Sequence, residues 1–148
     1  MQRHTAPQVA GRALIVHENT LLLVNGDGDG TFWVPPGGRS ELGEDIRACV
    51  RREVFEETGL TVSVGPLVAV SEYYDAPAAF HILQAHFFCT IESGTLDPDW
   101  IDHHGPVCQA RFFSPDEMRS LPRVFPGFLV DLDFSAPTFD LYKGFEIR

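Results

Sequence analysis

GRSELGEDIRACVRREVFEETGL, residues 38–60, is the stretch of this sequence that decides the fold. Its apolar residues recur with helical spacing, which predicts a helix from about Glu44 to Glu57. Gly59 follows the last predicted turn and is the expected C-terminal stop. The preceding Pro/Gly-rich segment, residues 33–38, predicts a connector that approaches another group closely.

The predicted helix places three carboxylates on one face. Glu53, Glu56 and Glu57 stand at i, i+3 and i+4, which are neighbouring positions on a helix surface. Two like charges about 4 Å apart repel by roughly 4 kcal/mol at the effective dielectric near a protein surface. A hard divalent cation with oxygen ligands turns this repulsion into binding. The cluster therefore indicates a metal site.

A solvated, charged helix end is the alternative interpretation of these glutamates. The helical wheel argues against it, because Glu53 and Glu57 fall within the apolar stripe and Glu56 lies at its edge. That stripe is formed by Ile46, Cys49, Val50 and Val54.

The same segment resembles the signature of the Nudix hydrolases, G-x5-E-x7-R-E-U-x-E-E-x-G-U, in which U is a bulky aliphatic residue. Nine fixed positions over 23 residues are far more specific than a single glycine motif. The resemblance implies an α/β fold, an α/β/α sandwich around a central mixed sheet, with residues 1–148 as a single domain. The matching residues are Gly38, Glu44, Arg52, Glu53, Val54, Glu56, Glu57, Gly59 and Leu60.

The resemblance also implies an activity and a cofactor. Members of the family hydrolyse the pyrophosphate bond of a nucleoside diphosphate linked to another moiety. Mg²⁺ is the expected cofactor, and Mn²⁺ is expected to substitute for it, because Mg²⁺ prefers carboxylates, waters and substrate phosphate oxygens. The small phosphorylated nucleotide is the expected partner.

Carried over residue by residue, the family pattern assigns roles within residues 38–60, here called the box. Glu53, Glu56 and Glu57 would bind the metal together with the Gly37 carbonyl. Arg52 would orient Glu53 through a charge-assisted hydrogen bond, and Glu44 would hold Arg52 in place. Glu44, Arg52 and Glu53 form the expected catalytic set. The general base is left open between Glu53 and a residue on a later loop.

Four residues outside the carboxylate cluster are candidates for substrate binding. Arg12 and Arg39 could contact phosphate, although a solvent-exposed role for Arg39 is equally expected. Gly38 would allow close approach of the substrate. Trp33 could stack a nucleobase, although aromatic residues of this kind more often belong to the core. Further aromatic candidates are Tyr73, Tyr74 and Phe80.

An acidic loop at residues 95–105 is the predicted source of a further base or metal ligand. It contains no glutamate, so Asp102 or His104 would take that role. A mobile, solvated surface turn is the alternative interpretation of this loop.

The substrate is not decided by the sequence. The short, MutT-like form of the chain favours nucleoside triphosphates, ahead of ADP-ribose or nucleotide sugars and then dinucleoside polyphosphates. A Nudix-like module that binds a nucleotide without cleaving it is the alternative from another functional class. Such modules typically lose carboxylates from the box, and this chain has all of them.

Composition narrows the possible partners. The 148 residues carry a formal net charge of −10 without a basic run, which argues against long nucleic acids. The apolar runs are too short for a membrane span, and the N-terminus lacks the apolar core of a signal peptide. Three widely spaced cysteines suit reduced thiols. We expect a cytoplasmic monomer or homodimer.

The flanking sequence predicts further elements of the sandwich. Alternating and β-branched residues indicate strands, and Ser114 begins a helix with Pro115 and Glu117 in favourable positions. We expect residues 1–9 to be a flexible segment and residues 125–148 to form an irregular wrap or subunit contact with a short helix near 127–132. The predicted strands cover residues 12–17, 20–24, 60–71, 80–91 and 107–113.

Overall fold

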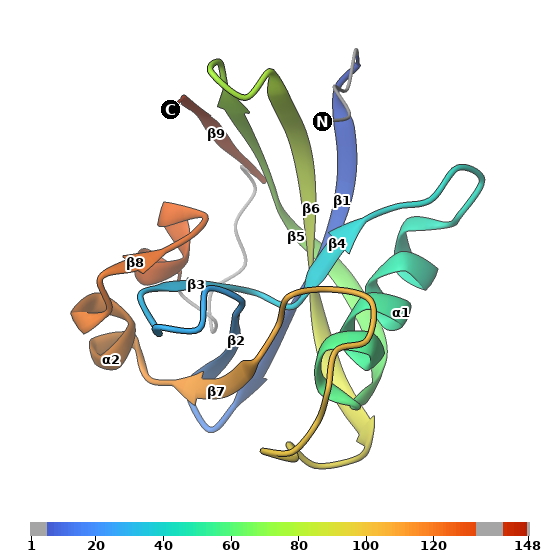
Figure 1. Ribbon diagram of the computed structural model, residues 1–148, viewed down its shortest axis with the longest axis vertical. Coiled ribbons are helices and arrows are strands. Elements are labelled where there is room, and N and C mark those ends of the chain that lie inside the picture. The colour runs from blue at the N-terminus through green and yellow to red at the C-terminus, as the bar shows by residue number, and fades with distance from the viewer. Residues whose placement is uncertain (1–5, 133–140, 148) are drawn as a thin grey trace.

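A single mixed sheet dominates the structure, a computed structural model that describes residues 6–132 and 141–147 (Figure 1). Its main strand order is β8-β3-β2-β1-β6-β5-β9, while β4 pairs with β1 and β7 pairs with β2. The strands are β1 (Gln8–His17), β2 (Thr20–Asn25), β3 (Phe32–Val34), β4 (Gly37–Arg39), β5 (Thr61–Asp75), β6 (Phe80–Ser93), β7 (Gln109–Phe113), β8 (Arg123–Val124) and β9 (Tyr142–Ile147). The helices are α1 (Ile46–Thr58), α2 (Pro115–Ser120) and the 3₁₀ helix η1 (Gly127–Asp131).

Strand β1 is the centre of the sheet. It runs parallel to β6 and antiparallel to both β2 and β4. The pairing with β4 sets Gly11 opposite Gly38 and Arg12 opposite Gly37. This register places the glycine-rich connector directly beside the central strand, at the point where α1 approaches the sheet.

Both faces of the central strands are buried, which explains their nearly continuous apolar sequences. Ala13 and Ile15 of β1 pack with Val50 and Val54 of α1 in one core cluster. Leu14, between them in the chain, belongs to the opposite cluster. That second cluster also contains Trp33, Phe113, Met118 of α2 and Leu129 of η1.

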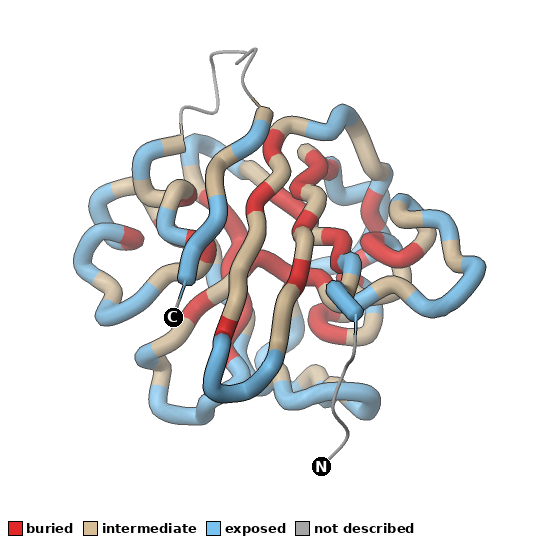
Figure 2. The backbone as a smooth tube through the Cα atoms, turned by 90° about the horizontal axis from the view of Figure 1, so that it is seen from above, coloured by how far each residue is buried: buried red, intermediate tan, exposed pale blue. Residues whose placement is uncertain are grey.

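The sheet therefore lies between α1 on one side and α2 with η1 on the other (Figure 1). This arrangement confirms the expected α/β/α sandwich. Buried positions follow the middle of the central strands, whereas the hairpin tips and connecting loops are exposed (Figure 2).

Helix α1 begins two residues later than predicted. Asp45 is its N-cap, with a side chain that accepts hydrogen bonds from the backbone N–H groups of Arg47 (2.9 Å) and Ala48 (3.2 Å). Glu44 consequently lies outside the helix, in the turn before it. The C-terminal stop is confirmed, since Gly59 has φ 76° and its N–H donates to the Phe55 carbonyl.

The ends of the chain are more regular than expected. Gln8 and Val9, assigned to a flexible segment, pair with β6 as the start of β1. Residues 142–147, assigned to an irregular wrap, form strand β9 parallel to β5. Residues 133–140 of that predicted wrap lie outside the described part of the chain. No helix in the described ranges is long and apolar enough to cross a membrane.

A small polar group lies within the sheet on the α2 side. His86 is fully buried, its Nε2 lies 3.1 Å from Ser71 Oγ, and its ring stands edge-on to Phe128. Burial, together with the nearby positive charge of Arg12, lowers the pKa of His86 to about 3. The histidine is therefore a neutral core residue at neutral pH.

This burial predicts a loss of stability in acid. Because the pKa of His86 is lower in the folded chain than in the unfolded chain, the unfolded state binds more protons as the pH falls below about 6.5. We expect His86 to remove about 3 kcal/mol of the free energy of unfolding by about pH 4. Urea titrations across this range should show a shallower fall for His86→Gln. The exposed His103→Gln should retain the wild-type slope, and equal slopes in all three proteins would contradict the assignment.

Candidate active site

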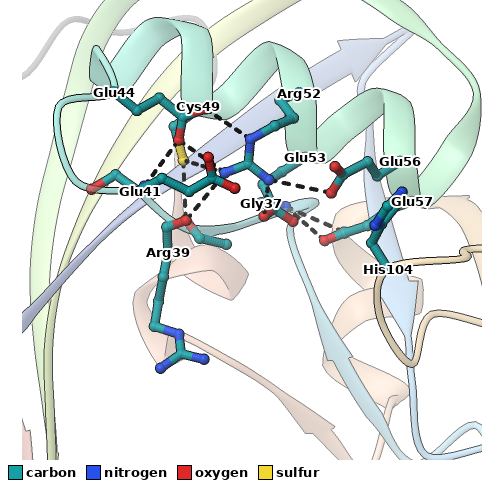
Figure 3. A network of polar contacts seen from close by, with 12 residues as sticks. Gly37, Arg39, Glu41, Glu44, Cys49, Arg52, Glu53, Glu56, Glu57 and His104 are labelled. Carbon is teal, nitrogen blue, oxygen red and sulfur yellow. Dashed lines mark hydrogen bonds and ion pairs between the residues drawn. The ribbon is translucent and has the colours of Figure 1, made fainter. Parts of the chain in front are cut away.

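Helix α1 presents its three clustered glutamates toward the glycine-rich strand β4 (Figure 3). Glu57 is buried, with 7% of its surface exposed, because it follows the apolar face of the helix. The side chains of Glu53 and Glu56 are 18% and 20% exposed. The prediction that these carboxylates share the core-facing side of the helix is confirmed for Glu57, whereas Glu53 and Glu56 lie at its margin.

Arg52 ties the acidic residues together. Its Nη1 donates to Glu53 Oε1 at 2.8 Å and to Glu56 Oε2 at 3.3 Å. On its other side, Nε donates to Glu44 Oε2 at 2.7 Å and Nη2 donates to Glu44 Oε1 at 2.9 Å. The Glu44 pair is the bidentate arrangement that gives arginine–carboxylate contacts their strength and fixed geometry. The structure thus shows Arg52 bonded to Glu53 and held by Glu44, as the sequence pattern implied.

Glu44 is fixed as a permanent anion. The hydrogen bond from Arg52 lowers the pKa of Glu44 to about 2. Its Oε1 also accepts a hydrogen bond from the Glu41 backbone N–H at 3.0 Å, which closes the turn before α1. The turn and the helix are therefore connected through Arg52 as well as through the chain.

The two glycines of β4 allow the strand to touch the carboxylates. A methyl group added to Gly38 would lie 2.6 Å from the carboxyl carbon of Glu53, and one added to Gly37 would lie 2.2 Å from the Gly11 carbonyl oxygen. The Gly37 N–H is 3.3 Å from both carboxylate oxygens of Glu57. A side chain at Gly38 would push β4 away from the helix, and one at Gly37 would push it away from β1.

Burial and mutual repulsion act on the proton affinity of the cluster. Burial, opposed by Arg12 and reinforced by Glu53, raises the pKa of Glu57 to about 8. Burial also raises the pKa of Glu53, although Arg52 opposes the change. Strongly perturbed carboxyl groups in a cavity are typical of functional sites.

Arg12 enters the site from the central strand. Its guanidinium donates through Nη1 to the carbonyls of Pro35 (3.2 Å) and Gly37 (3.1 Å), and through Nε to Gln84 Oε1 (2.9 Å). Gln84 on β6 is 1% exposed, and its Nε2 has no partner among the described residues. Arg12 therefore lies beside Glu57 with its orientation set by β4 and β6.

A cavity of about 720 Å³ opens beside the carboxylates. Its walls include Arg12, Gly38 and Arg39, three of the four candidate substrate-binding residues. Trp33, the fourth, was predicted wrongly. It is 4% exposed, its Nε1 donates to the Gly30 carbonyl at 2.7 Å, and its ring packs against Phe113. Its indole fills the α2-side core because β3 turns it inward.

The acidic loop approaches the glutamates. Asp102 and His104 line the same cavity as Glu53, Glu56 and Glu57. The Asp102 carboxylate also organises its own loop, since Oδ1 accepts from the His104 N–H at 3.1 Å and Oδ2 from the Val107 N–H at 3.2 Å. Of the two candidates, Asp102 is therefore the one whose side chain is already used in hydrogen bonds within the loop.

Trp100 fastens this loop to the end of α1. Its Nε1 donates to the Glu56 carbonyl at 2.9 Å, and its ring meets Phe55 edge-on with centroids 5.6 Å apart. The ring also lies so close to Gly59 that an added methyl would be 2.8 Å away. The indole thus links the loop that carries Asp102 and His104 to the helix that carries the glutamates.

The donor set suits a hard divalent cation. Glu53, Glu56, Glu57 and the Gly37 carbonyl all offer oxygen. Burial favours the protonated form of Glu57, and a cation bound beside it would favour the anion. Within residues 6–132 and 141–147, no three histidine, cysteine, aspartate or glutamate side chains are gathered closely enough to hold an ion. Glu53 and Glu56 are both bonded to Arg52 Nη1. When bound, the metal would neutralise phosphate charge and acidify a water.

Several residues of the site were not found from the sequence. Trp100, Gln84 and Arg123 come from separate parts of the chain and meet the box only through the fold. Gln84 gave a usable signal, since a single amide stands among apolar residues in a strand. Phe32 and Phe125, which also line the cavity, gave none that distinguishes them from core aromatics.

Comparison with known proteins gives a match to a single protein family. A family model described as the NUDIX domain matches residues 7–128. The mouse protein named nucleoside diphosphate-linked moiety X motif 6 is 34% identical over 105 residues, 64% of this chain and 34% of that protein. The ADP-ribose pyrophosphatase of Methanocaldococcus jannaschii is 34% identical over 93 residues, 61% of this chain and 54% of that protein. The aligned region thus spans only about a third to a half of these relatives.

Solved structures agree with the sequence match. A NUDIX hydrolase from Nitrosomonas europaea superimposes with a TM-score of 0.66 at 31% identity, covering 78% of this chain and 77% of that chain. A UDP-X diphosphatase superimposes with a TM-score of 0.65 at 25% identity, covering 84% of this chain and 57% of that chain.

The contact between Trp100 and Gly59 predicts a non-additive pair of substitutions. Gly59→Ala imposes a positive φ on a residue with a Cβ, at a cost of about 1 kcal/mol, and also drives that Cβ into the indole. We expect a total loss of about 2–3 kcal/mol in the free energy of unfolding, falling to about 1 kcal/mol when Trp100→Ala removes the ring. Urea denaturation of the four proteins measures this coupling.

Gly43 provides the matched control for that cycle. It has φ 81°, and an added methyl would meet nothing within 4 Å, so Gly43→Ala isolates the backbone penalty. A Gly59→Ala loss that is the same with and without Trp100 would show that the indole does not press against position 59.

Proposed function

Because the chain belongs to the Nudix family, we propose that it is a divalent-metal-dependent hydrolase of the pyrophosphate bond in small nucleotides. The observation that carries this proposal is the bonding of Arg52 to Glu44, Glu53 and Glu56 at the edge of a cavity. The arrangement concentrates oxygen ligands where a phosphate chain can enter. A solvated, charged helix end would not explain why so many carboxylates are gathered there.

Mg²⁺ is the proposed cofactor, with Mn²⁺ as a substitute. Glu53, Glu56 and Glu57 would hold it with the Gly37 carbonyl. That carbonyl already accepts a hydrogen bond from Arg12, and a carbonyl oxygen has a second lone pair available. Arg12 would stand next to the phosphate that the metal neutralises, and Gly38 with Arg39 would line its path.

The proton acceptor of the reaction is proposed to be Glu53 or His104. Glu53 has a raised pKa and a hydrogen bond from Arg52 that fixes its orientation. His104 reaches the same cavity from the loop held by Trp100. Asp102 is the weaker alternative, because both of its carboxylate oxygens accept backbone hydrogen bonds.

The relatives support a nucleotide as the substrate. These relatives include an ADP-ribose pyrophosphatase, a MutT-like protein and a UDP-X diphosphatase. We propose a small phosphorylated nucleotide and leave triphosphates and nucleoside diphosphate-linked moieties as the two classes to separate. The three free cysteines are consistent with a reducing compartment, and we propose a cytoplasmic location.

Substitution of Glu53 tests the catalytic proposal. Glu53→Gln keeps the shape of the side chain but removes its charge, so it should lower kcat at least a hundredfold, about 2.7 kcal/mol in transition-state stabilisation. The measurement is phosphate or nucleotide release with Mg²⁺ over a panel of nucleotide pyrophosphates. Glu92→Gln, an exposed change of the same charge on β6, should leave kcat unchanged.

Two outcomes of this assay would contradict hydrolysis by the site. Unchanged turnover in Glu53→Gln would place the chemistry elsewhere. Nucleotide binding by calorimetry without turnover of any panel member, in the presence of Mg²⁺ or Mn²⁺, would favour the non-catalytic binding module.

Metal binding has an expected effect on stability. A cation that binds the Glu57 carboxylate in place of its proton should raise the melting temperature of the wild-type protein in saturating Mg²⁺. Glu57→Gln has no charge to bury, so without cation it should be at least as stable as wild type and gain little from Mg²⁺. Scanning fluorimetry with and without EDTA checks both. A Mg²⁺-induced shift in Glu57→Gln as large as in wild type would exclude Glu57 as a ligand.

A further inference from the structure

We propose that the α1 side of the sheet, beyond the end of that helix, is the surface through which two copies of this chain associate. The cover given by α1 ends at Gly11, where an added methyl would lie 2.6 Å from Val50 and 3.2 Å from Ile46, the first residue of the helix. Val9, two residues nearer the N-terminus on the same face of β1, is 47% exposed. The strands continue past the helix there (Figure 1).

The strand register fixes which side chains share this surface. Residues directly opposite one another in paired strands point to the same side of a sheet. Val9 of β1 lies opposite Leu83 of β6, which lies opposite Glu72 of β5. Glu72 in turn lies opposite Phe145 of β9. The two neighbouring rows contain His81, Tyr74 and Ile147 on one side and Ala85, Val70 and Tyr142 on the other. We call these ten side chains the open face.

Exposed apolar side chains gather on the open face. The described residues include nine large apolar side chains that are exposed, and five lie on this face or at its border with α1: Val9, Leu67, Tyr142, Phe145 and Ile147. Their exposed fractions run from 37% to 68%. With about 200 Å² for a large side chain, they leave on the order of 500 Å² in contact with water. An apolar patch of this size is at the upper end of what monomers expose and often serves binding.

The polar groups at the centre of the open face are paired with one another. His81 Nε2 lies 2.9 Å from Glu72 Oε2, and the Tyr142 hydroxyl donates to Glu72 Oε1 at 3.0 Å. The Phe145 ring stacks on Tyr74 with centroids 6.2 Å apart and meets His81 edge-on at 5.6 Å. Glu72 is the one carboxylate of the open face, so nearly all of the chain's net charge of −10 lies elsewhere. The surface therefore suits a neutral, apolar partner.

A second copy of the open face is the partner that fits it. The large side chains Tyr142, Phe145 and Ile147 stand on β9, whereas β1 and β6 present smaller ones such as Val9 and Ala85. A two-fold axis through the middle of the face sets the large side chains of one copy against the small ones of the other. Sheets stacked in this way lie about 10 Å apart with their strands within about 30° of each other. Both copies together bury about 1,000 Å² of apolar surface, which reaches the size of a specific interface.

Pairing through the free edge of β9 is the competing arrangement, and the backbone of that strand disfavours it. Tyr142 lies opposite Val70 and Phe145 lies opposite Glu72, so residues 143–144 together oppose a single residue of β5. A bulge of this kind on an edge strand interrupts the ladder that another chain would extend. We therefore place the contact on the face of the sheet and not at its edge.

The open face lies directly behind one wall of the large cavity. Alternate residues of β5 and β6 point into that cavity, among them Tyr73, Phe80 and Ile82. Tyr73 adjoins Tyr74 in the chain, and Ile82 adjoins His81, so the same two strands serve both surfaces. Of the aromatic candidates for stacking a base, Tyr73 and Phe80 thus line the cavity, whereas Tyr74 belongs to the open face. A second copy would support these strands from behind and leave the cavity open.

Sedimentation velocity over a concentration series tests the proposal. We expect the wild-type protein to form a dimer with a Kd of about 10 µM or less. Val9→Asp and Phe145→Asp each bring two charges, one per copy, into the contact and should raise this Kd at least a hundredfold. Ile91→Asp is the matched control, because Ile91 is 39% exposed at the opposite end of β6 and lies outside the open face. It should leave the Kd unchanged. Far-UV circular dichroism checks the fold of each variant, and the two test sites lie on different strands.

Salt separates an apolar contact from an ion-paired one. Two copies with a net charge of −10 each repel one another, so raising NaCl from about 50 to about 500 mM should strengthen the dimer several-fold. A dimer that salt weakens would be held by ion pairs and would overturn the open face as the contact. A wild-type protein that stays monomeric at about 100 µM would also overturn it, as would equal Kd values for Ile91→Asp and the two test variants. None of these measurements depends on hydrolysis, so their outcome is independent of the proposed function.

Discussion

The hydrogen bonds of Arg52 are the interaction on which the rest of this site depends. One guanidinium serves Glu44 through two nitrogens and reaches Glu53 and Glu56 through the third. Without it, Glu44 and the three glutamates that line the cavity would repel one another by several kcal/mol. Glu57 has no hydrogen bond to Arg52, and burial, reinforced by Glu53, keeps its pKa raised. The site is thus held together by Arg52 before any ligand binds, and the proposed cation would supply the further positive charge.

This electrostatic arrangement constrains the backbone around it. Glu57 can be buried because Gly37 offers it an N–H group, and Gly37 can do so because β4 lies flat against β1. Gly38 permits the Glu53 carboxyl to approach within a distance that any side chain would prevent. The spacing of glycines and glutamates in the box is therefore required by packing as well as by chemistry. The glycines stand where the carboxylates contact β4.

What could be predicted from the sequence depends on how far apart in the chain the contacting residues lie. The helix, its glycine stop, the carboxylate face and the bonds of Arg52 depend on residues within one short segment, and the pattern predicted them. Trp33 was misassigned because its neighbours Pro35 to Gly38 resemble a binding loop, while its inward orientation is set by β3 pairing with β2. The strand at residues 142–147 was missed because Gly144, with φ 98°, resembles a break in the chain. Trp100 and Phe125 act across the fold, and neither has a local signal.

Recognition of the substrate is consequently separated from the box. In the proposed function, the segment 38–60 would determine where a pyrophosphate lies, since it supplies the carboxylates, Arg52 and Gly38. The surfaces that can distinguish one nucleotide from another come from β1, β3, β5, β6 and the segment around β8, which meet only in the folded chain. A change in Tyr73 could therefore alter what is bound while the Arg52 network stays intact, because Tyr73 does not bond to that network. On the proposed function, specificity would be a property of the sheet, whereas the chemistry would be a property of α1 and β4.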